Sequence, residues 1–454
     1  MIPIFIIVAI CVLVICRKDW KKSVYLLIFA IPYFGFIQLK ILHLTMFAPI
    51  IHDITIIFPI YVLFILSRRK KEHVSFYLPS YFINFIFFLV FLIIVFTINP
   101  FYETSWIIRL VGLKVYIYYL LFILIGFEFI ESEFEFKKLC NFFAITAIIP
   151  CAIGIMQYLG SYYIDYRETI TFFYAGNERL ANIATQQFNK FDWGAGIKFF
   201  RLPSTFSFSH QFNLFAICML IPAVTSVSLS KTQVEKFFYS MIIVLLILGA
   251  YASGVRATTI YLLFFVLYLI LMQAKLYNIL IIFLLIIIPL SFINLESYPV
   301  LQAMFSKSTE QVPAYIKTFS LHDYPVFFRD HFFGFGVGSA TIEAGHYAPE
   351  KVPELEFHEG YFARVTKELG VPGLLTMITF LAIIIYEIFL SIKSIKHNKA
   401  YILFCSSILA VYLIAIMMST KSMLFFLKYP TNFLLYFFLG IAIKLKFLNL
   451  DKQK

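Results

Sequence analysis

The sequence predicts an all-α fold: a polytopic integral membrane protein with about 12–13 transmembrane helices and large extracytoplasmic loops that carry short helices. Of its 454 residues, 61% are hydrophobic and only 14% are charged, a balance that a soluble core of this size does not need. Apolar runs of near-spanning length recur along the chain, and basic residues gather in the short connections between them. A bilayer is the solvent that fits these observations.

Successive apolar runs, each close to the length that crosses a bilayer, define the expected helices in order. They cover roughly residues 2–16, 23–38, 46–66, 77–98, 107–129, 139–159, 206–228, 237–252, 257–273, 277–294, 370–392, 400–418 and 423–445. The second and third runs contain polar interruptions, so one tilted helix with a re-entrant segment is an alternative for them. The first run has no basic segment before it and no small-residue cleavage site after it, and we expect a retained helix.

Lysine and arginine in the connections predict the orientation of the chain. The basic segments fall in alternate connections and are expected in the cytoplasm: 17–22, 68–71, 137–138, 231–236, 393–399 and 444–454. The N-terminus and every second loop are then expected outside. The formal net charge of +12 is thus a topology signal, and we expect no nucleic-acid partner.

A single transmembrane domain over residues 1–454 is the simplest organisation, because no internal repeat is apparent at a fixed period. Two large loops are expected outside, over residues 160–205 and 295–369, and the second holds a glycine-rich segment and an amphipathic helix. The tight 253–259 turn falls on the same side. Most of the unusual polar residues therefore face one side of the membrane.

Two arginines are functional candidates on this predicted outer side. Arg201 lies where the first loop enters an apolar run, and its alternative role is an interfacial anchor that reaches the lipid head groups. Arg256 lies in the 253–259 turn, against the bias that keeps positive charge in the cytoplasm. Arg256 is therefore the stronger candidate of the two.

A glycine-rich segment, Gly334-Phe335-Gly336-Val337-Gly338-Ser339, follows Arg329 in the long loop. It matches neither GxGxxG nor GxxxxGK[ST], and no strand precedes it, so nucleotide binding is excluded. The glycines instead let a backbone turn sharply or approach a neighbour closely. The six cysteines lie in or beside apolar runs without a CxxC pair, which argues against a disulfide framework or a zinc site.

The amphipathic stretch at the end of the long loop supplies the remaining candidates. Arg364 and Glu368 are four residues apart, and we expect a plain surface ion pair between them. His358 and Glu359 begin like a zinc-protease helix, but Phe362 stands where the second histidine is required, so no metal is expected. Either side chain could act as a general base or, alternatively, could cap the helix or solvate the loop.

Three motifs follow one another on the predicted outer face. The first is Arg201-Leu202-Pro203-Ser204-Thr205-Phe206 with Asn213 downstream, and the second is Ser253-Gly254-Val255-Arg256-Ala257. The third runs from Gly334-Phe335-Gly336-Val337-Gly338 through Glu359 to Glu368-Leu369-Gly370-Val371-Pro372-Gly373. In this order they resemble the bacterial O-antigen polymerase and O-antigen ligase superfamily of polytopic membrane glycosyltransferases, over about residues 195–385. That superfamily commonly has a cytoplasmic N-terminus, which differs from the orientation expected here.

The resemblance implies an enzyme of the bacterial inner membrane that works on its extracytoplasmic face without a cofactor. Such enzymes transfer a glycan from an undecaprenyl-pyrophosphate-linked donor to an acceptor hydroxyl, among membrane lipids and with a chain-length regulator as a further partner. Arg201 and Arg256 would bind the pyrophosphate, and Glu359, with His358 as second choice, would be the base. The supporting residues would be Gly334, Gly336, Gly338, Arg329 and Arg364.

Polymerisation of repeat units is the favoured activity, because polymerase-like members of the superfamily often carry a glutamate where this chain has Glu359. The alternative within the same class is ligation of a finished polymer to a lipid or protein acceptor. A different class, a flippase for lipid-linked oligosaccharides, predicts charged residues inside the spanning helices, whereas the polar residues of this sequence concentrate in the external loops.

Overall fold

The structure is a computed structural model, and it confirms an all-α, polytopic membrane fold. It describes residues 2–37, 53–69, 78–99, 105–163, 191–192, 198–199, 201–206, 208–255, 257–273, 329, 331–340, 360–395, 398–419 and 424–451. Helices make up nearly all of this part. Its strands are the antiparallel two-residue pair β1 (Phe191–Asp192) and β2 (Lys198–Phe199).

Eight segments of the described part are long and apolar enough to cross a membrane. They are Ser80–Ile98, Trp106–Phe129, Glu133–Gly160, Ser209–Leu229, Gln233–Ala252, Tyr361–Ser394, Lys399–Met418 and Thr431–Leu448. Two shorter apolar helices, Ile7–Cys16 and Thr258–Met272, accompany them. The expected run 277–294 lies outside the described residues.

The first half of the chain forms mostly short helices, several of which follow one another directly within one span. The elements are α1 (Ile2–Cys16), α2 (Lys21–Ala30), η1 (Ile31–Tyr33), α3 (Phe34–Phe36), the π-helical η3 (Asp53–Ile57), α5 (Phe58–Arg69), α6 (Ser80–Ile98), α7 (Trp106–Ile117), α8 (Leu121–Phe129), α9 (Glu133–Thr146) and α10 (Ile148–Tyr163). Runs 107–129 and 139–159 of the sequence thus each become a pair of helices.

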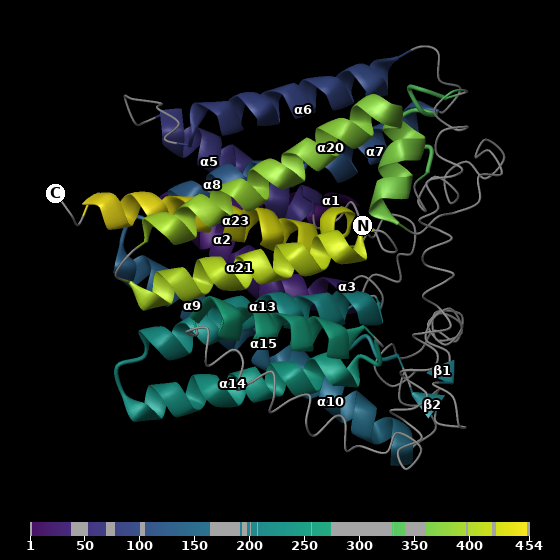
Figure 1. Cartoon of the computed structure of the whole chain (residues 1–454). Helices are drawn as coiled ribbons and strands as arrows, with labels where there is room; N and C mark the ends of the chain where they lie inside the picture. The colour runs from purple at the N-terminus through teal and green to yellow at the C-terminus, as the bar shows by residue number, and fades with distance from the viewer. Residues whose placement is uncertain are drawn as a thin grey trace.

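The second half contains longer helices. They are α13 (Ser209–Leu229), α14 (Gln233–Ala252), α15 (Thr258–Gln273), α20 (Tyr361–Ser394), α21 (Lys399–Met418), the short α22 (Leu424–Leu427) and α23 (Thr431–Asp451). The amphipathic stretch expected inside the long loop is the first part of α20, which bends at Gly370, where φ is 62°. In Figure 1 this first part turns across the end of the bundle before the rest of α20 follows the other helices.

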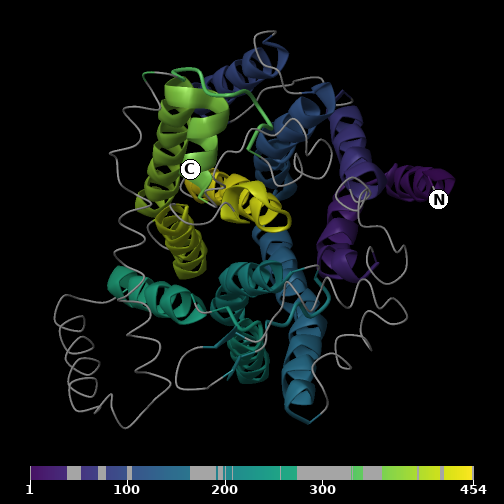
Figure 2. The ribbon, with the colours of Figure 1, turned by 90° about the vertical axis from the view of Figure 1, so that its right-hand side faces the viewer.

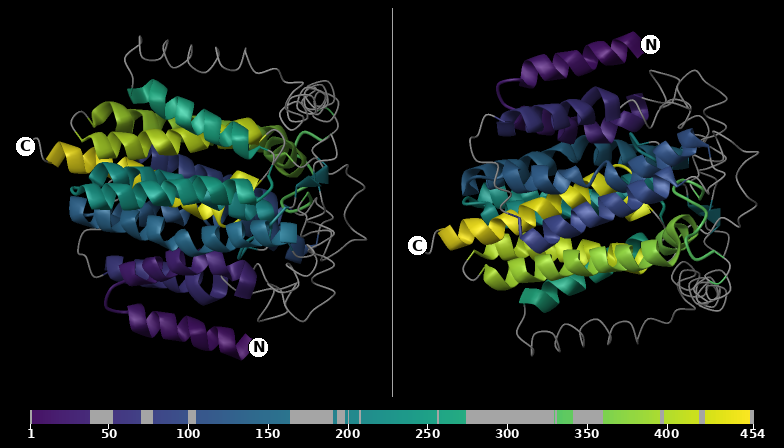
Figure 3. Two further views of the ribbon diagram at one scale, coloured as in Figure 1. Left: turned by 90° about the horizontal axis from the view of Figure 1, so that it is seen from below. Right: turned by 90° about the horizontal axis from the view of Figure 1, so that it is seen from above.

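Most helices run side by side along one common direction (Figure 1), and Figure 2 shows them almost end-on. The last helix, α23, lies in the middle of this bundle, where it packs on α8, α13, α20 and α21, while α1 lies at the edge (Figure 3). Position explains burial: α6 buries Phe82, Leu89 and Ile93 on one face and exposes Phe87 and Phe91 on the other. The outer apolar face is one that lipid would cover.

One end of the bundle collects the basic connections, and we call it the basic end. The chain passes from α1 to α2, from α8 to α9, from α13 to α14 and from α20 to α21 there, and the C-terminus lies at the same end (Figure 1). The N-terminus lies at the opposite end. The described residues of the basic segments that were predicted to share one side therefore share one end of the structure.

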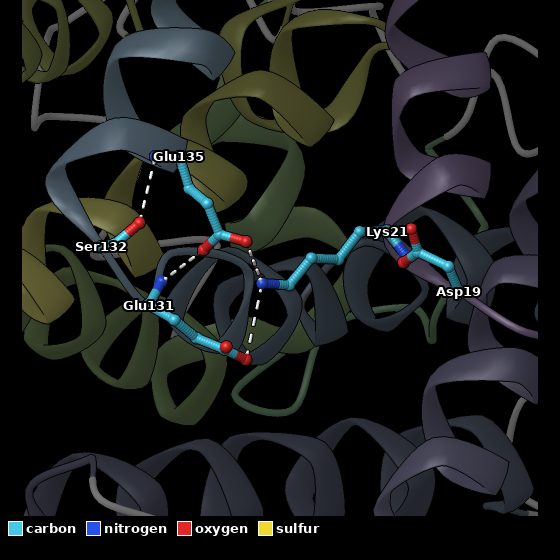
Figure 4. Close-up of polar contacts among 5 residues, drawn as sticks. All are labelled: Asp19, Lys21, Glu131, Ser132 and Glu135. Carbon is cyan, nitrogen blue, oxygen red and sulfur yellow. Dashed lines mark hydrogen bonds and ion pairs between the residues drawn. The ribbon is translucent and has the colours of Figure 1, made fainter.

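Acidic side chains anchor the connections at the basic end. Figure 4 shows Lys21 between two of them, with its Nζ 2.8 Å from Glu135 Oε1 and 3.4 Å from Glu131 Oε1. Ser132 caps α9 by accepting a hydrogen bond from the Glu135 N–H, and Glu135 in turn accepts one from the Glu131 N–H. Ser132 and Glu135 have the spacing of a capping box, although Glu135 bonds back to the residue before the N-cap, and together these bonds mark where α9 begins.

Candidate functional site

The glycine-rich segment lies directly on the bend of α20, at the end of the bundle opposite the basic end (Figure 1). The Phe335 N–H donates to the Lys367 carbonyl at 2.7 Å, and the Gly336 N–H donates to the Glu368 carbonyl at 3.0 Å. In return, the Val371 N–H donates to the Phe332 carbonyl at 2.9 Å. Two segments that are about 30 residues apart thus form one backbone-bonded unit.

Proline and glycine explain why α20 needs this partner. In an uninterrupted helix the carbonyl of Glu368 would accept from residue 372, but Pro372 has no N–H to donate. The positive φ of Gly370 also turns the Val371 N–H away from the carbonyl of Lys367. The glycine-rich segment supplies the hydrogen bonds that the bend removes, as buried backbone groups require.

Close backbone packing explains the glycines themselves. Gly338 has φ of 90°, and a Cβ added there would lie 2.2 Å from the carbonyl oxygen of Ile108 in α7. A Cβ on Gly112, one turn further along α7, would lie 2.5 Å from the Gly338 nitrogen. Both positions therefore exclude any larger residue. The expected close approach of the backbone is confirmed, and the neighbour that it approaches is α7.

The pair formed by Arg364 and Glu368 corrects the expectation of a surface ion pair. Arg364 Nε does lie 3.0 Å from Glu368 Oε1, but the two side chains are only 1% and 0% exposed. The i, i+4 spacing predicted the contact, but it could not reveal that α7 and the glycine-rich segment cover this face of α20. A buried pair of this kind needs further hydrogen bonds to offset the loss of water.

Glu368 receives those further bonds from the glycine-rich segment. Its Oε2 accepts from the Gly338 N–H at 3.1 Å, and its Oε1 accepts from the Ala340 N–H at 3.2 Å as well as from Arg364. The Arg364 guanidinium lies over the Tyr116 ring of α7, 5.8 Å from its centroid. One carboxylate therefore joins three chain segments: α20, the glycine-rich segment and, through Arg364, α7.

The Arg201 segment forms a second tight structure at the same end of the bundle. Ser204 has a positive φ of 54°, and the Gln157 side chain of α10 bonds to both its N–H and its carbonyl, at 2.9 Å and 3.1 Å. The Leu202 N–H donates to the Ser253 carbonyl at 3.2 Å. The first predicted motif thus lies directly against the turn that carries the second.

Asn213, in α13, also stabilises the turn that the Arg201 segment contacts. Its Nδ2 donates to the Ala250 carbonyl and the Ser253 hydroxyl, both at 3.0 Å, and lies 2.6 Å from the Thr258 hydroxyl. These groups belong to the end of α14 and the start of α15, so Asn213 holds the 253–255 turn between them. Asn213 is fully buried, which suits a side chain that positions backbone and contacts no solvent.

The sequence-predicted site residues fall into two groups. Arg201 and Arg329 are described, the first half-buried beside the 253–255 turn and the second exposed before the glycine-rich segment. Arg256, His358 and Glu359 lie outside the described residues, although Ser253–Val255 and Gly360 next to them are described. The structure thus brings the Arg201 motif to the turn of the second motif, and the glycine-rich segment to Glu368.

Buried charged residues within the predicted apolar runs are a feature that the sequence reasoning missed. Asp53, only 5% exposed, forms an ion pair with Lys114 of α7, and the Tyr119 hydroxyl donates to its Oδ1 at 3.1 Å. Glu387, in α20, is fully buried, and neither of its carboxylate oxygens has a hydrogen-bond partner among the described residues. These positions are exceptions to the concentration of polar residues that was expected in the external loops. Their place within apolar runs was the signal available in the sequence.

Comparison with protein-family models gives no match, and comparison with curated proteins gives none either. The fold and the apolar helices define a multi-pass membrane protein. Any closer assignment depends on the motifs and on the contacts described above.

Proposed function

We propose that this protein is a membrane glycosyltransferase that polymerises undecaprenyl-pyrophosphate-linked repeat units into a surface polysaccharide. The observation that carries the proposal is the pairing of the motifs. The Arg201 segment is bonded to the Ser253 turn, and the glycine-rich segment is bonded to the Glu368 region, at one end of the bundle. The basic connections lie at the other end, which supports an extracytoplasmic site in a bacterial inner membrane.

The chemistry of the donor supports a role for the arginines. Negative charge grows on the pyrophosphate as the glycosidic bond to it breaks, and a guanidinium can stabilise this charge through paired, charge-assisted hydrogen bonds. The backbone just after Arg201 is held by the Gln157 side chain, which bonds to Ser204, and by the Ser253 carbonyl, which accepts from Leu202. Arg256 would act from the adjoining turn.

A base would remove the proton from the acceptor hydroxyl, whose pKa is far above neutral. A positioned base contributes about two to four decades of rate. Glu359 is our first choice, and His358 the second. Both precede Gly360, the N-cap residue before the part of α20 that crosses the end of the bundle.

The length distribution of polysaccharide in cells tests this proposal. Arg201→Ala, Arg256→Ala and Glu359→Gln should each shorten or abolish the ladder of polymer lengths at unchanged protein level, because each removes a charge from the reaction centre. Arg17→Ala, in the basic connection after α1, is the matched control and should leave the ladder intact. A normal ladder in both arginine variants would refute the pyrophosphate role, and full activity of Glu359→Gln would shift the base to His358.

Two alternatives are separated by reconstitution with a short lipid-linked oligosaccharide. A polymerase lengthens the glycan, whereas an O-antigen ligase moves it to an added lipid or protein acceptor. A flippase moves the lipid across the bilayer and leaves the glycan unchanged. The observation in favour of a flippase is the presence of Lys114 and Glu387 inside spanning helices, with Asp53 buried against Lys114.

A further inference from the structure

The Asp53–Lys114 ion pair lies between the two motif pairs, and neither the motifs nor the proposed reaction use it. On one side, the Phe36 N–H of α3 donates to the Thr205 carbonyl of the Arg201 segment at 2.8 Å. On the other side, α7 carries both Lys114 and Gly112, which packs on the glycine-rich segment. The ion pair therefore belongs to the group of residues that connects the Arg201 segment with the glycine-rich segment.

Aromatic contacts complete this connection. The Tyr429 ring lies 6.0 Å from Phe34 and 6.1 Å from Tyr119, measured between centroids. The Tyr429 carbonyl accepts a hydrogen bond from Gln211, near the start of α13, at 3.0 Å. Tyr119 in turn donates to Asp53. A continuous series of contacts thus runs from the Arg201 segment to Asp53 and Lys114.

Lys114 is the more accessible member of the pair. Its side chain is 24% exposed, whereas that of Asp53 is 7% exposed. Hydrocarbon offers an ammonium group no partner, so contact of the Lys114 ammonium with lipid tails would be unfavourable. Lys114 lies eight residues after Trp106, the exposed first residue of α7, or about 12 Å along the helix. Side chains on a helix lean toward its N-terminus, so the ammonium lies closer to the level of Trp106 than the Lys114 backbone does.

Asp53 has hydrogen-bond partners besides Lys114. Its Oδ1 has a separate donor in Tyr119, and its carbonyl accepts from the Tyr118 hydroxyl at 3.1 Å. It also begins the π-helical turn η3, a rare conformation that is frequent at functional sites. If the lysine turned to another anion, Asp53 would keep the Tyr119 hydrogen bond on Oδ1, whereas Oδ2 would lose its contact with Lys114.

We propose that Lys114 binds a phosphate group of a lipid head group at this end of the bundle, with Asp53 holding its ammonium while no lipid is bound. Phosphate oxygens are strong acceptors for a lysine, which acts on them as a compact point charge. The phosphate belongs either to a polyprenyl diphosphate, in which case Lys114 adds a third cation to the proposed donor site, or to an ordinary anionic phospholipid.

The decisive comparison is Asp53→Asn against the double variant Asp53→Asn/Lys114→Met. Neither leaves a buried carboxylate without its lysine, and they differ only in the ammonium group. Binding is measured with purified protein in nanodiscs that contain a polyprenyl diphosphate or, separately, phosphatidylglycerol. We expect the double variant to bind the phosphate lipid about 10- to 100-fold more weakly than Asp53→Asn, as the loss of one hydrogen bond to a charged group implies.

The lipid that shows this difference identifies the source of the phosphate. Lys21→Met, which removes an equally ion-paired lysine at the basic end, should bind like the wild type. Equal binding by Asp53→Asn and the double variant would overturn the proposal. So would a charge-swapped Asp53→Lys/Lys114→Asp protein that binds normally, because a purely structural pair tolerates the exchange. Polymer synthesis is assayed separately, so that a failed transferase proposal and a failed lysine proposal are distinguishable.

Discussion

Removal of the Glu368 carboxylate should destabilise the protein far more than removal of an exposed acid. Glu368→Ala leaves the guanidinium of Arg364, only 1% exposed, without its ion-pair partner, and leaves the Gly338 and Ala340 N–H groups without their acceptor. Breaking a buried pair from one side costs about 3–5 kcal/mol of unfolding free energy. A pair at the surface, as the sequence alone suggested, would be worth only about 0–1 kcal/mol.

Arg364→Ala, which removes the other partner of the ion pair, should lower the free energy of unfolding by less. Arg364→Ala leaves Glu368 with its two backbone donors, so we expect a loss of about 1.5–3 kcal/mol, the range for one hydrogen bond to a charged group. Reversible unfolding of the purified protein in mixed micelles measures both values. The control is Glu131→Ala, whose side chain is 59% exposed in its ion pair with Lys21 and which should lose less than about 1 kcal/mol. A loss below 1 kcal/mol for Glu368→Ala, or a larger loss for Arg364→Ala, would refute the reasoning.

Two further substitutions test the packing of the same helices. Gly338→Ala forces a Cβ against the Ile108 carbonyl at a φ of 90°, so it should lower the unfolding temperature and destabilise the protein by about 1–3 kcal/mol; an unchanged unfolding temperature would contradict the close contact with α7. Glu387→Gln removes a fully buried carboxylate that has no hydrogen-bond partner among the described residues, so it should leave the unfolding temperature unchanged or raise it. A fall of several degrees would indicate that Glu387 has a partner in the folded protein.

Composition and the spacing of apolar runs predicted the membrane fold, because the bilayer that surrounds the protein dictates both. A bilayer requires apolar helices of a minimum length, and such helices are found at Ser80–Ile98, Ser209–Leu229 and Lys399–Met418, close to the expected runs. The division of run 139–159 between α9 and α10 was not predictable, because apolar composition carries no information about local breaks in a helix. The start of α9 was readable, since Ser132 and Glu135 have the spacing of a capping box.

The contacts of the candidate site were predictable only between residues that are close together in the sequence. Gly338 was expected to allow a close backbone approach, and it does, but no pattern in the sequence pointed to α7 as the neighbour. Arg364 and Glu368 were correctly paired from their spacing and wrongly placed at the surface, because burial depends on segments far away in the sequence. The ion pair of Asp53 and Lys114 joins residues 61 positions apart, and it required the tertiary structure.

The bend of α20 explains why its two motifs must occur together. Pro372 and Gly370 remove helical hydrogen bonds and let residues 361–369 turn across the end of the bundle. The exposed carbonyls of that bend would be unfavourable inside a membrane protein unless another backbone satisfied them. Only a segment that can approach to hydrogen-bonding distance from two sides, as the glycine-rich segment does between α7 and α20, can fill this role. The two motifs are therefore one structural unit, and the buried carboxylate of Glu368 fixes their register.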